Sequence, residues 1–165
     1  MLESLKVSAS SADSQRSSLP LRDLIMHSRV MTMLAPDGAI IAAVLAKIPN
    51  LMALYVFGSQ VQGMSGPESD LDLSVLAPGF IDPNVLWSLS NEIASLVNSD
   101  VDLLDLRAAS TVMQYQILST GKTVWNIGLQ ARLFEVSVFS EKLALDEARE
   151  PLLRTITREG HVYAR

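Results

Sequence analysis

The pair Gly58-Ser59, followed after ten residues by Asp70-Leu71-Asp72, limits what this chain can be more than any other feature. Residues 55–57 (Tyr-Val-Phe) run into the Gly-Ser turn as a buried strand would, and apolar and polar residues alternate over 71–75 as in a second strand. Two carboxylates two residues apart on a strand point to the same face. A Gly-Ser pair after the preceding strand can offer N–H groups and a hydroxyl to phosphate. Together these parts can hold a metal-bound nucleoside triphosphate.

The composition limits which classes of protein this chain can belong to. A chain of 165 residues that is 48% hydrophobic suits one compact domain with a sizeable core. It has no cysteine, which excludes disulfides, thiolate zinc sites and thiol catalysis, and its histidines, His27 and His161, lie near opposite ends. The apolar run Ala39–Ala46 is too short to span a bilayer, and the serine-rich start lacks the apolar core of a signal peptide. We therefore expect no membrane association and a cytoplasmic location.

The charge is unevenly placed. Residues 1–106 carry 5 basic and 12 acidic side chains, and no Lys or Arg occurs between Lys47 and Arg107. A protein that grips DNA or RNA along its backbone needs a basic surface, so direct nucleic-acid binding is not expected. An acidic site can still bind a polyphosphate when divalent cations lie between the two.

The pattern of apolar residues predicts strands that alternate with helices. We expect a polar leader over 1–20 and a short helix over 21–34. Asp37 is a plausible N-cap for a helix that ends near Pro49. The remaining predicted elements are strands over 51–57, 71–77, 101–106 and 122–125, and helices over 85–96, 111–119 and 129–148, the last broken by Pro151. This order indicates an α/β (α+β) fold with a small mixed sheet flanked by helices and a long C-terminal helix. The expected division is a leader or short helix over 1–30, a central domain over 31–125 and a C-terminal helical segment over 126–165.

Each part of the site also has an ordinary structural explanation that needs no ligand. A single Asp-x-Asp on a strand is more often a solvated face than a metal site, and Gly-Ser after a strand is usually just a turn. The combination changes this balance, because Gly63 and Gly66 in the connecting loop allow the backbone to approach a ligand closely.

These residues resemble the signature of the polymerase-beta nucleotidyltransferase superfamily, and in particular its minimal nucleotidyltransferases. The similarity covers residues 38–125 and includes the segment 100–106 (Asp-Val-Asp-Leu-Leu-Asp-Leu), which is similar to the third-carboxylate strand of that branch. The resemblance places the third acid at Asp102. Strand parity alone leaves Asp100 and Asp102 on one face and turns Asp105 to the other.

The resemblance implies the roles of the site residues. Two Mg²⁺ ions would bridge the carboxylates and the triphosphate of ATP and align an in-line displacement at the α-phosphorus. Asp70 and Asp72 would be shared metal ligands, and Asp102 would complete the metal near the attacking hydroxyl and help to remove its proton. Gly58 and Ser59 would hold the β- and γ-phosphates at a short helix start.

One departure from the family pattern concerns cations. The family loop often carries arginine where this chain has Gln60 and Gln62. Phosphate charge must then be balanced by metal alone, by Arg107 or Lys122, or by a partner. Arg107 directly follows the third strand, so it could reach the site, and an ordinary surface cation is the equal alternative.

The resemblance also suggests a partner. Proteins of this kind are commonly antitoxins that transfer AMP from ATP to a tyrosine of a HEPN-domain ribonuclease toxin, in a hetero-oligomer. The C-terminal segment fits such a role, since Leu129, Leu133 and Val136 fall on one helix face and Phe134, Val138 and Leu145 on another. The equal alternative is that this helix simply packs on its own sheet.

Three hypotheses follow. The chain is a Mg²⁺-dependent adenylyltransferase that acts as an antitoxin, or a non-catalytic antitoxin that blocks its toxin by contact, or a small-molecule nucleotidyltransferase of the aminoglycoside type. The missing arginines favour the second hypothesis. The short C-terminal segment, with no second acid-bearing domain, counts against the third.

Overall fold

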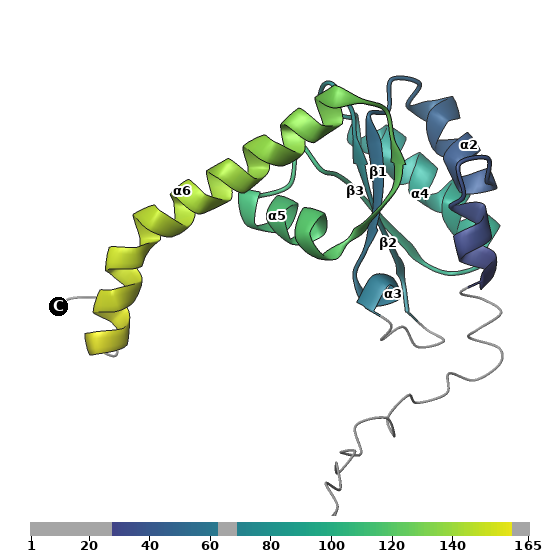
Figure 1. Ribbon diagram of the computed structural model, residues 1–165. Coiled ribbons are helices and arrows are strands. Elements are labelled where there is room, and N and C mark those ends of the chain that lie inside the picture. Colours follow the sequence, from purple (N-terminus) through teal and green to yellow (C-terminus); the bar gives the residue numbers. More distant parts are fainter. Residues whose placement is uncertain (1–27, 63–68, 160–165) are drawn as a thin grey trace, which may run out of the picture.

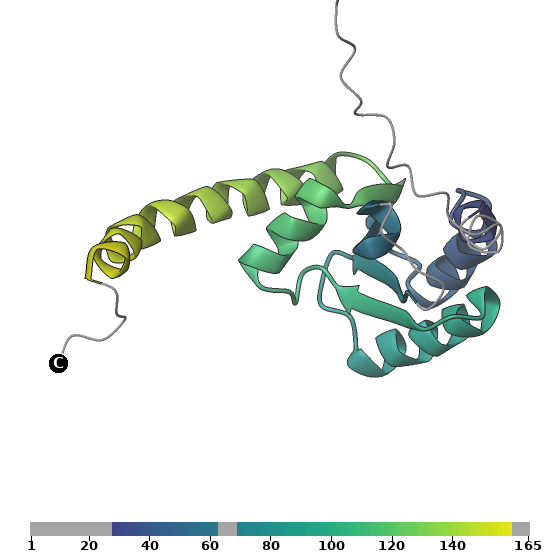
Figure 2. The same cartoon turned by 90° about the horizontal axis from the view of Figure 1, so that it is seen from below.

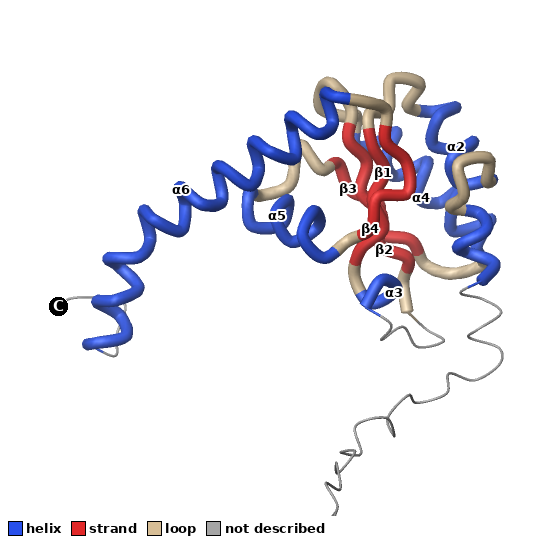
Figure 3. The backbone as a smooth tube through the Cα atoms, viewed as in Figure 1, coloured by secondary structure: helices blue, strands red, loops and turns tan. Residues whose placement is uncertain are grey.

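Four strands form one mixed sheet in the computed structural model, which describes residues 28–62 and 69–159 (Figures 1 and 3). The strands are β1 (Ala53–Phe57), β2 (Leu71–Leu76), β3 (Val101–Asp105) and β4 (Lys122–Asn126), in the order β3-β2-β1-β4. β1 runs antiparallel to β2 and β4, whereas β2 and β3 are parallel. The start of β2 and the start of β3 therefore meet at the end of the sheet where β1 finishes.

Helices cover both faces of this sheet. Residues 28–33 are helical, and the other helices are α2 (Ala39–Lys47), α3 (Ser59–Gln62), α4 (Pro83–Val97), α5 (Thr111–Thr120) and α6 (Leu129–Glu159). α2 and α4 pack on one face around Leu54, Val56 and Leu73. α5 and the first turns of α6 pack on the other face around Tyr55 and Phe57. The view from below shows these two layers on either side of the strands (Figure 2).

The burial of the strands explains why they are predictable. All five residues of β1 are buried, because this central strand has a neighbour on each edge and helices over each face. α4 begins where the Asp82 carboxylate accepts a hydrogen bond from the Asn84 N–H, with Pro83 in the first turn. It ends at Asn98, which adopts the left-handed conformation. Ser110 caps α5 by accepting from the Met113 N–H.

Two predictions about helix ends are wrong. Gly38, not Asp37, is the N-cap of α2, and no side chain caps this helix. α6 does not stop before Pro151 but continues through it to Glu159. Proline removes one backbone hydrogen bond from a helix, and this part of α6 is exposed, so water can satisfy the freed carbonyl. Figure 1 shows the axis of α6 changing direction in its C-terminal part.

The tyrosine at the centre of β1 links the sheet to α6. The buried Tyr55 hydroxyl donates a 2.7 Å hydrogen bond to Oε1 of Glu135. Burial raises the pKa of Tyr55 above its ordinary value, and the hydrogen bond to Glu135 and the negative charge of Glu135 raise it further. The phenol therefore keeps its proton and remains a donor to α6.

Some expectations concern residues outside those described. The polar leader and the glycines Gly63 and Gly66 lie there, so their structure is not part of the fold given above. Across the described ranges, none of the helices combines the length and the apolar character needed to cross a membrane.

Candidate active site

The turn after β1 requires glycine at its first position. Gly58 has a φ of +70°, in the left-handed region that side chains rarely adopt. A Cβ at this position would collide with Oδ2 of Asp72, so the backbone here lies against the second carboxylate of the motif. Ser59 follows at the start of α3, which has just 4 residues. Phosphate binding here would depend on individual N–H groups and the hydroxyl rather than on a helix dipole.

The register of the sheet brings the predicted acids to this turn. Asp72 pairs with Phe57 of β1 on one side and with Asp102 of β3 on the other. Residues paired in register share a face, so Asp72 and Asp102 both lie on the side of the sheet that carries α5. Asp70 lies just before β2 and is exposed, as is Asp102, whereas Asp72 is half-buried.

The charges of Asp70 and Asp102 act on Asp72. Partial burial raises the pKa of the Asp72 carboxyl above its ordinary value, and the negative charges of Asp102 and then Asp70 raise it further. Two uncompensated neighbours of the same charge are an arrangement that a bound cation would stabilise.

The donor set fits a hard cation in chemistry. Carboxylate oxygens are the ligands that Mg²⁺ prefers. Within residues 28–62 and 69–159, however, no three acidic, histidine or cysteine side chains already surround one metal position. Because Asp70 and Asp102 are exposed, their side chains are free to rotate towards a shared ion. The carboxylates therefore fit Mg²⁺ in their chemical type and in their position, and their side chains would complete the coordination when the ion binds.

The other acids of the β3 segment separate as strand parity predicts. Asp105 is buried on the opposite side, where its carboxylate accepts hydrogen bonds from the N–H groups of Ile81 (3.0 Å) and Arg107 (2.9 Å). Asp105 thus holds two loops together at the far end of the sheet. Asp100 is exposed and precedes β3 at the same end as Asp70.

The expectation that Arg107 reaches the site is wrong. Its Nε and Nη2 donate to the carbonyl oxygen of Ala77 at 3.1 and 3.0 Å, and its guanidinium lies 4.8 Å from the centre of the Phe134 ring. Ala77 follows the end of β2, whereas Asp72 lies near its start, so the two are separated by roughly 16 Å of strand. The sequence places Arg107 after β3, but β3 runs away from the site.

Lys122 lies at the correct end of the sheet. It opens β4 and pairs with Val56, one residue before Phe57. Neighbouring residues on a strand point to opposite faces, so the register assigns Lys122 to the face opposite Asp72. It is exposed, at the edge of the sheet.

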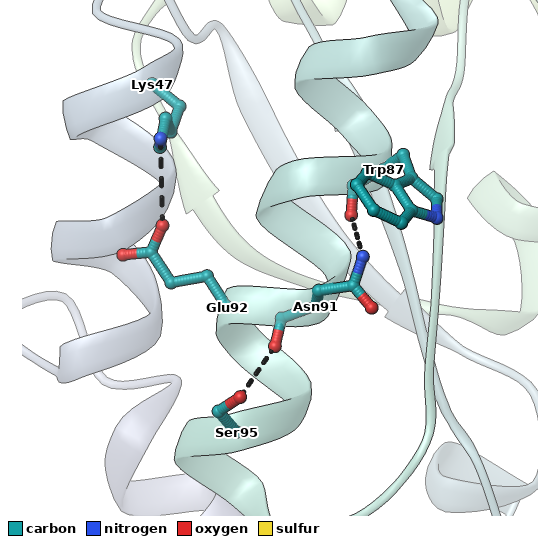
Figure 4. Close-up of polar contacts among 5 residues, drawn as sticks. All are labelled: Lys47, Trp87, Asn91, Glu92 and Ser95. Atoms are coloured by element: carbon teal, nitrogen blue, oxygen red, sulfur yellow. Dashed lines mark hydrogen bonds and ion pairs between the residues drawn. The ribbon is translucent and has the colours of Figure 1, made fainter.

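A polar groove continues from Asp70 and was not predicted from the sequence. It has a volume of about 530 Å³ and is lined by Asp70, Asn91, Ala94, Ser95, Asn98, Ser99 and Asp100. Figure 4 shows Asn91 one turn after Trp87 on α4 and Ser95 one turn after Asn91, with Glu92 directed instead towards Lys47 of α2. The polar residues 91, 95 and 98 follow helical spacing and were the available signal.

Comparison with known proteins agrees with this geometry. The family model described as "Polymerase beta, Nucleotidyltransferase" matches residues 40–127. The protein adenylyltransferase MntA of Shewanella oneidensis is 38% identical over 117 residues, which are 71% of this chain and 84% of that protein.

Solved structures show the same likeness in three dimensions. A crystal structure of a toxin–antitoxin pair with AMP-PNP contains a chain that is 37% identical, with a TM-score of 0.65, over 72% of this chain and 95% of that one. A structure of the tri-AMPylated Shewanella oneidensis HEPN toxin in complex with MNT antitoxin matches at 34% identity and a TM-score of 0.60, over 72% of this chain and 93% of that one. On the strength of the matched sequence, the fold and the Gly-Ser and carboxylate geometry, this chain belongs to the polymerase-beta nucleotidyltransferase family.

Proposed function

We propose that this chain is an antitoxin that transfers AMP from ATP to a tyrosine of a HEPN-domain ribonuclease toxin, with Mg²⁺ as cofactor, and so neutralises the toxin in the cytoplasm. The observation that supports it most is the in-register pair Asp72 and Asp102 beside Asp70 and Gly58. The adenylyltransferase MntA, 38% identical, supplies the class of acceptor.

Each of these residues would have its own role in the reaction. The backbone at Gly58 and the hydroxyl of Ser59 would hold the β- and γ-phosphates, and Asp70 and Asp72 would be shared metal ligands with Asp102 completing the set. Mg²⁺, when bound, supplies charge neutralisation between these carboxylates and the triphosphate and aligns the in-line displacement.

The reaction exchanges one bond to the α-phosphorus for another. The tyrosine oxygen attacks the α-phosphorus and forms a new P–O bond, while the bond from the α-phosphorus to the α,β-bridging oxygen breaks. Pyrophosphate leaves on the side of the Gly58-Ser59 turn. The phenolic proton passes to the Asp102 carboxylate, which stands on the neighbouring strand, and from there to water.

α6 provides a surface for the toxin. Phe134 and Val138 of this helix pack towards its own domain. Its opposite side carries a stripe of large aliphatic residues at spacings of four, three and seven, each exposed by 58–70%: Leu129, Leu133, Val136 and Leu143. An apolar helix face of this length is typical of a surface that receives another helix. The burial of Val138 and the exposure of the outer stripe agree with the two apolar faces expected from the sequence.

A second candidate is an antitoxin that blocks its toxin by contact alone. It is favoured by the absence of Lys and Arg from 48 to 106, together with the engagement of Arg107 at the far end of the sheet. A small-molecule acceptor has less support, because the similar protein of known activity modifies protein.

One experiment separates the two antitoxin mechanisms. The protein is incubated with ATP, Mg²⁺ and the product of the neighbouring reading frame, and intact masses are measured. AMP-sized mass gains on the partner that Asp70→Ala and Asp72→Ala abolish would support adenylylation. Full neutralisation of the toxin by both variants, with no added mass, would establish contact inhibition instead.

A further inference from the structure

We infer that a groove beside the first turns of α6 receives an acidic side chain of the partner protein and pairs it with Arg107. This Arg107 groove has a volume of about 410 Å³. It is lined by Gln130, Leu133, Phe134 and Ser137 of α6, together with Met52, Pro78 and Arg107 at the far end of the sheet. The inference rests on the proposed function, because it takes the occupant from the protein that covers the exposed stripe of α6.

The Arg107 groove adjoins the exposed stripe of α6. Leu133 belongs to both, and its side chain is 58% exposed. Gln130 and Ser137 lie three residues before and four residues after Leu133, so they are its neighbours on the surface of the helix. A partner helix packed on the stripe would therefore hold some of its own side chains over the groove.

Arg107 is fixed in position by contacts that leave most of its donors free. Nε and Nη2 each donate to the carbonyl oxygen of Ala77, and the ring of Phe134 lies 4.8 Å from the guanidinium carbon. A guanidinium carries five N–H donors. Those that remain include the fork between Nη1 and Nη2, and no hydrogen bond within the described residues uses them. This fork has the geometry that binds both oxygens of a carboxylate.

The charge of Arg107 has no counter-ion in the described part of the chain. None of the ion pairs there includes this arginine. Asp105, the nearest acid in the sequence, uses its carboxylate to accept from the backbone N–H groups of Ile81 and Arg107 instead. The first turn of α6 contains no acidic residue, so the partial positive charge of the helix N-terminus adds to that of the guanidinium. The groove therefore favours an anion.

The lining favours a single carboxylate on an apolar stem. Met52, Leu133 and Phe134 are apolar, and Arg107 is the one cation in the lining. A nucleic acid would need several cations in a row, and this groove supplies one. The methylene groups of a glutamate can lie on the apolar side chains while its carboxylate meets the guanidinium fork. We therefore expect an acidic residue, best a glutamate, on the partner helix that covers α6.

The test places a negative charge in the groove and leaves Arg107 in place. Ser137 is exposed, and its hydroxyl donates to the carbonyl oxygen of Phe134 within the helix. Ser137→Glu would neutralise Arg107 and repel the partner's carboxylate, whereas Ser137→Gln adds a side chain of the same size without the charge. In calorimetric titration with the product of the neighbouring reading frame, without ATP, we expect Kd to be at least tenfold higher for Ser137→Glu than for Ser137→Gln. The gap should narrow as NaCl is added.

A control separates the groove from the overall charge of the helix. Ala148 is exposed on the same side of α6, about three helical turns beyond Ser137 and outside the lining. Ala148→Glu should bind the partner within twofold of the wild type. Equal losses in Ala148→Glu and Ser137→Glu would mean general repulsion and overturn the inference, as would equal Kd values for Ser137→Glu and Ser137→Gln.

An exchange of charges identifies the occupant. Each Asp and Glu of the partner is replaced in turn by Lys, and the variants are titrated with Ser137→Glu. One of them should bind at least fivefold more tightly than the wild-type partner does, because its lysine meets the new glutamate. If none does, the groove does not receive a carboxylate.

The result for the groove is distinct from the result for the proposed function. AMP-sized mass gains on the partner, together with equal Kd values for Ser137→Glu and Ser137→Gln, would refute the groove and leave the transfer reaction standing. A charge-dependent Kd with no added mass would support the groove and leave contact inhibition as the mechanism. A neighbouring product that does not bind at all would refute both.

Discussion

Asp72 and Asp102 stand side by side in register on the parallel strands β2 and β3, one half-buried and the other exposed. This pairing makes the two acids of the motif and the third acid one unit, although 29 residues separate the two in sequence. A shared cation would stabilise this group of like charges, and removal of any one carboxylate would weaken the binding of that cation.

Replacement of Asp72 should abolish catalysis without unfolding the protein. We expect Asp72→Asn to lower the rate of AMP transfer by at least about 10³-fold, because metal-bound phosphate loses a shared ligand. The melting temperature in EDTA should be equal to or above that of the wild type, since the amide no longer repels Asp70 and Asp102. Rates from intact mass and melting curves test both parts. Asp37→Asn, at an exposed position outside the site, should match the wild type in each.

Ligand binding should stabilise the wild type and not this variant. At concentrations of about 100 times Kd, Mg²⁺ with a non-hydrolysable ATP analogue should add about 2.7 kcal/mol, a rise of roughly 5–10 °C for a chain of this size. Asp72→Asn should gain less than a third of that rise. Equal gains in both proteins would mean that the nucleotide binds away from the carboxylates.

Substitutions of three glycines should have graded effects. Gly79→Ala meets nothing within 4 Å and should be neutral, and Gly128→Ala meets open space but has a φ of +81°, so it should cost about 1 kcal/mol. Gly58→Ala combines positive φ with a collision against Asp72 and should cost about 1–3 kcal/mol and remove AMP transfer. Urea unfolding measures the series. A neutral Gly58→Ala would contradict the close approach of this turn to the carboxylate.

Arg107 should matter for stability and not for nucleotide. Arg107→Ala loses two hydrogen bonds to the Ala77 carbonyl and the contact with Phe134, so we expect a loss of about 1–3 kcal/mol. The KM for ATP should stay within twofold. Arg107→Lys, which keeps the charge but not the forked geometry, should recover little of the stability. A large rise in the KM for ATP in a stable variant would restore the role expected from the sequence.

Partner binding should depend on the outer side of α6. Leu143→Glu places a charge in the exposed apolar stripe and should weaken the complex with the toxin at least tenfold without lowering the melting temperature. Ala148→Glu adds the same charge at an exposed position roughly two-fifths of a turn around the helix from Leu143 and serves as the control. Calorimetric titration of the pair compares them, and equal affinities would place the toxin elsewhere.

The sequence predicted the parts of the fold that depend on local pattern. The buried run of β1 and the alternation of residue types in β2 are set within a few residues, and strand parity correctly turned Asp105 away from the site. The features that the sequence did not predict depend on the directions of the strands and on contacts between distant segments. The destination of Arg107 follows from the way β3 runs, and the groove needs α4 and Asp70 to meet from segments far apart in the chain.

The prediction that Pro151 breaks the helix was wrong for a different reason. The rule that proline ends a helix considers only the backbone hydrogen bond that proline removes. In an exposed helix, water can bind the freed carbonyl instead, and the helix can continue. The ion pair between Arg154 and Glu150 links the turns on either side of the proline and favours continuation.

The part of α6 beyond Leu145 should open more readily than the rest of the fold. Beyond Leu145, its described side chains are exposed except for the half-buried Ile156, so little apolar surface opposes local opening there. A segment of this kind unfolds at a free energy far below that of the sheet, and its amides exchange with solvent long before those of β1. We therefore expect two cooperative units, a sheet that persists and a helical arm that contacts with a partner would stabilise.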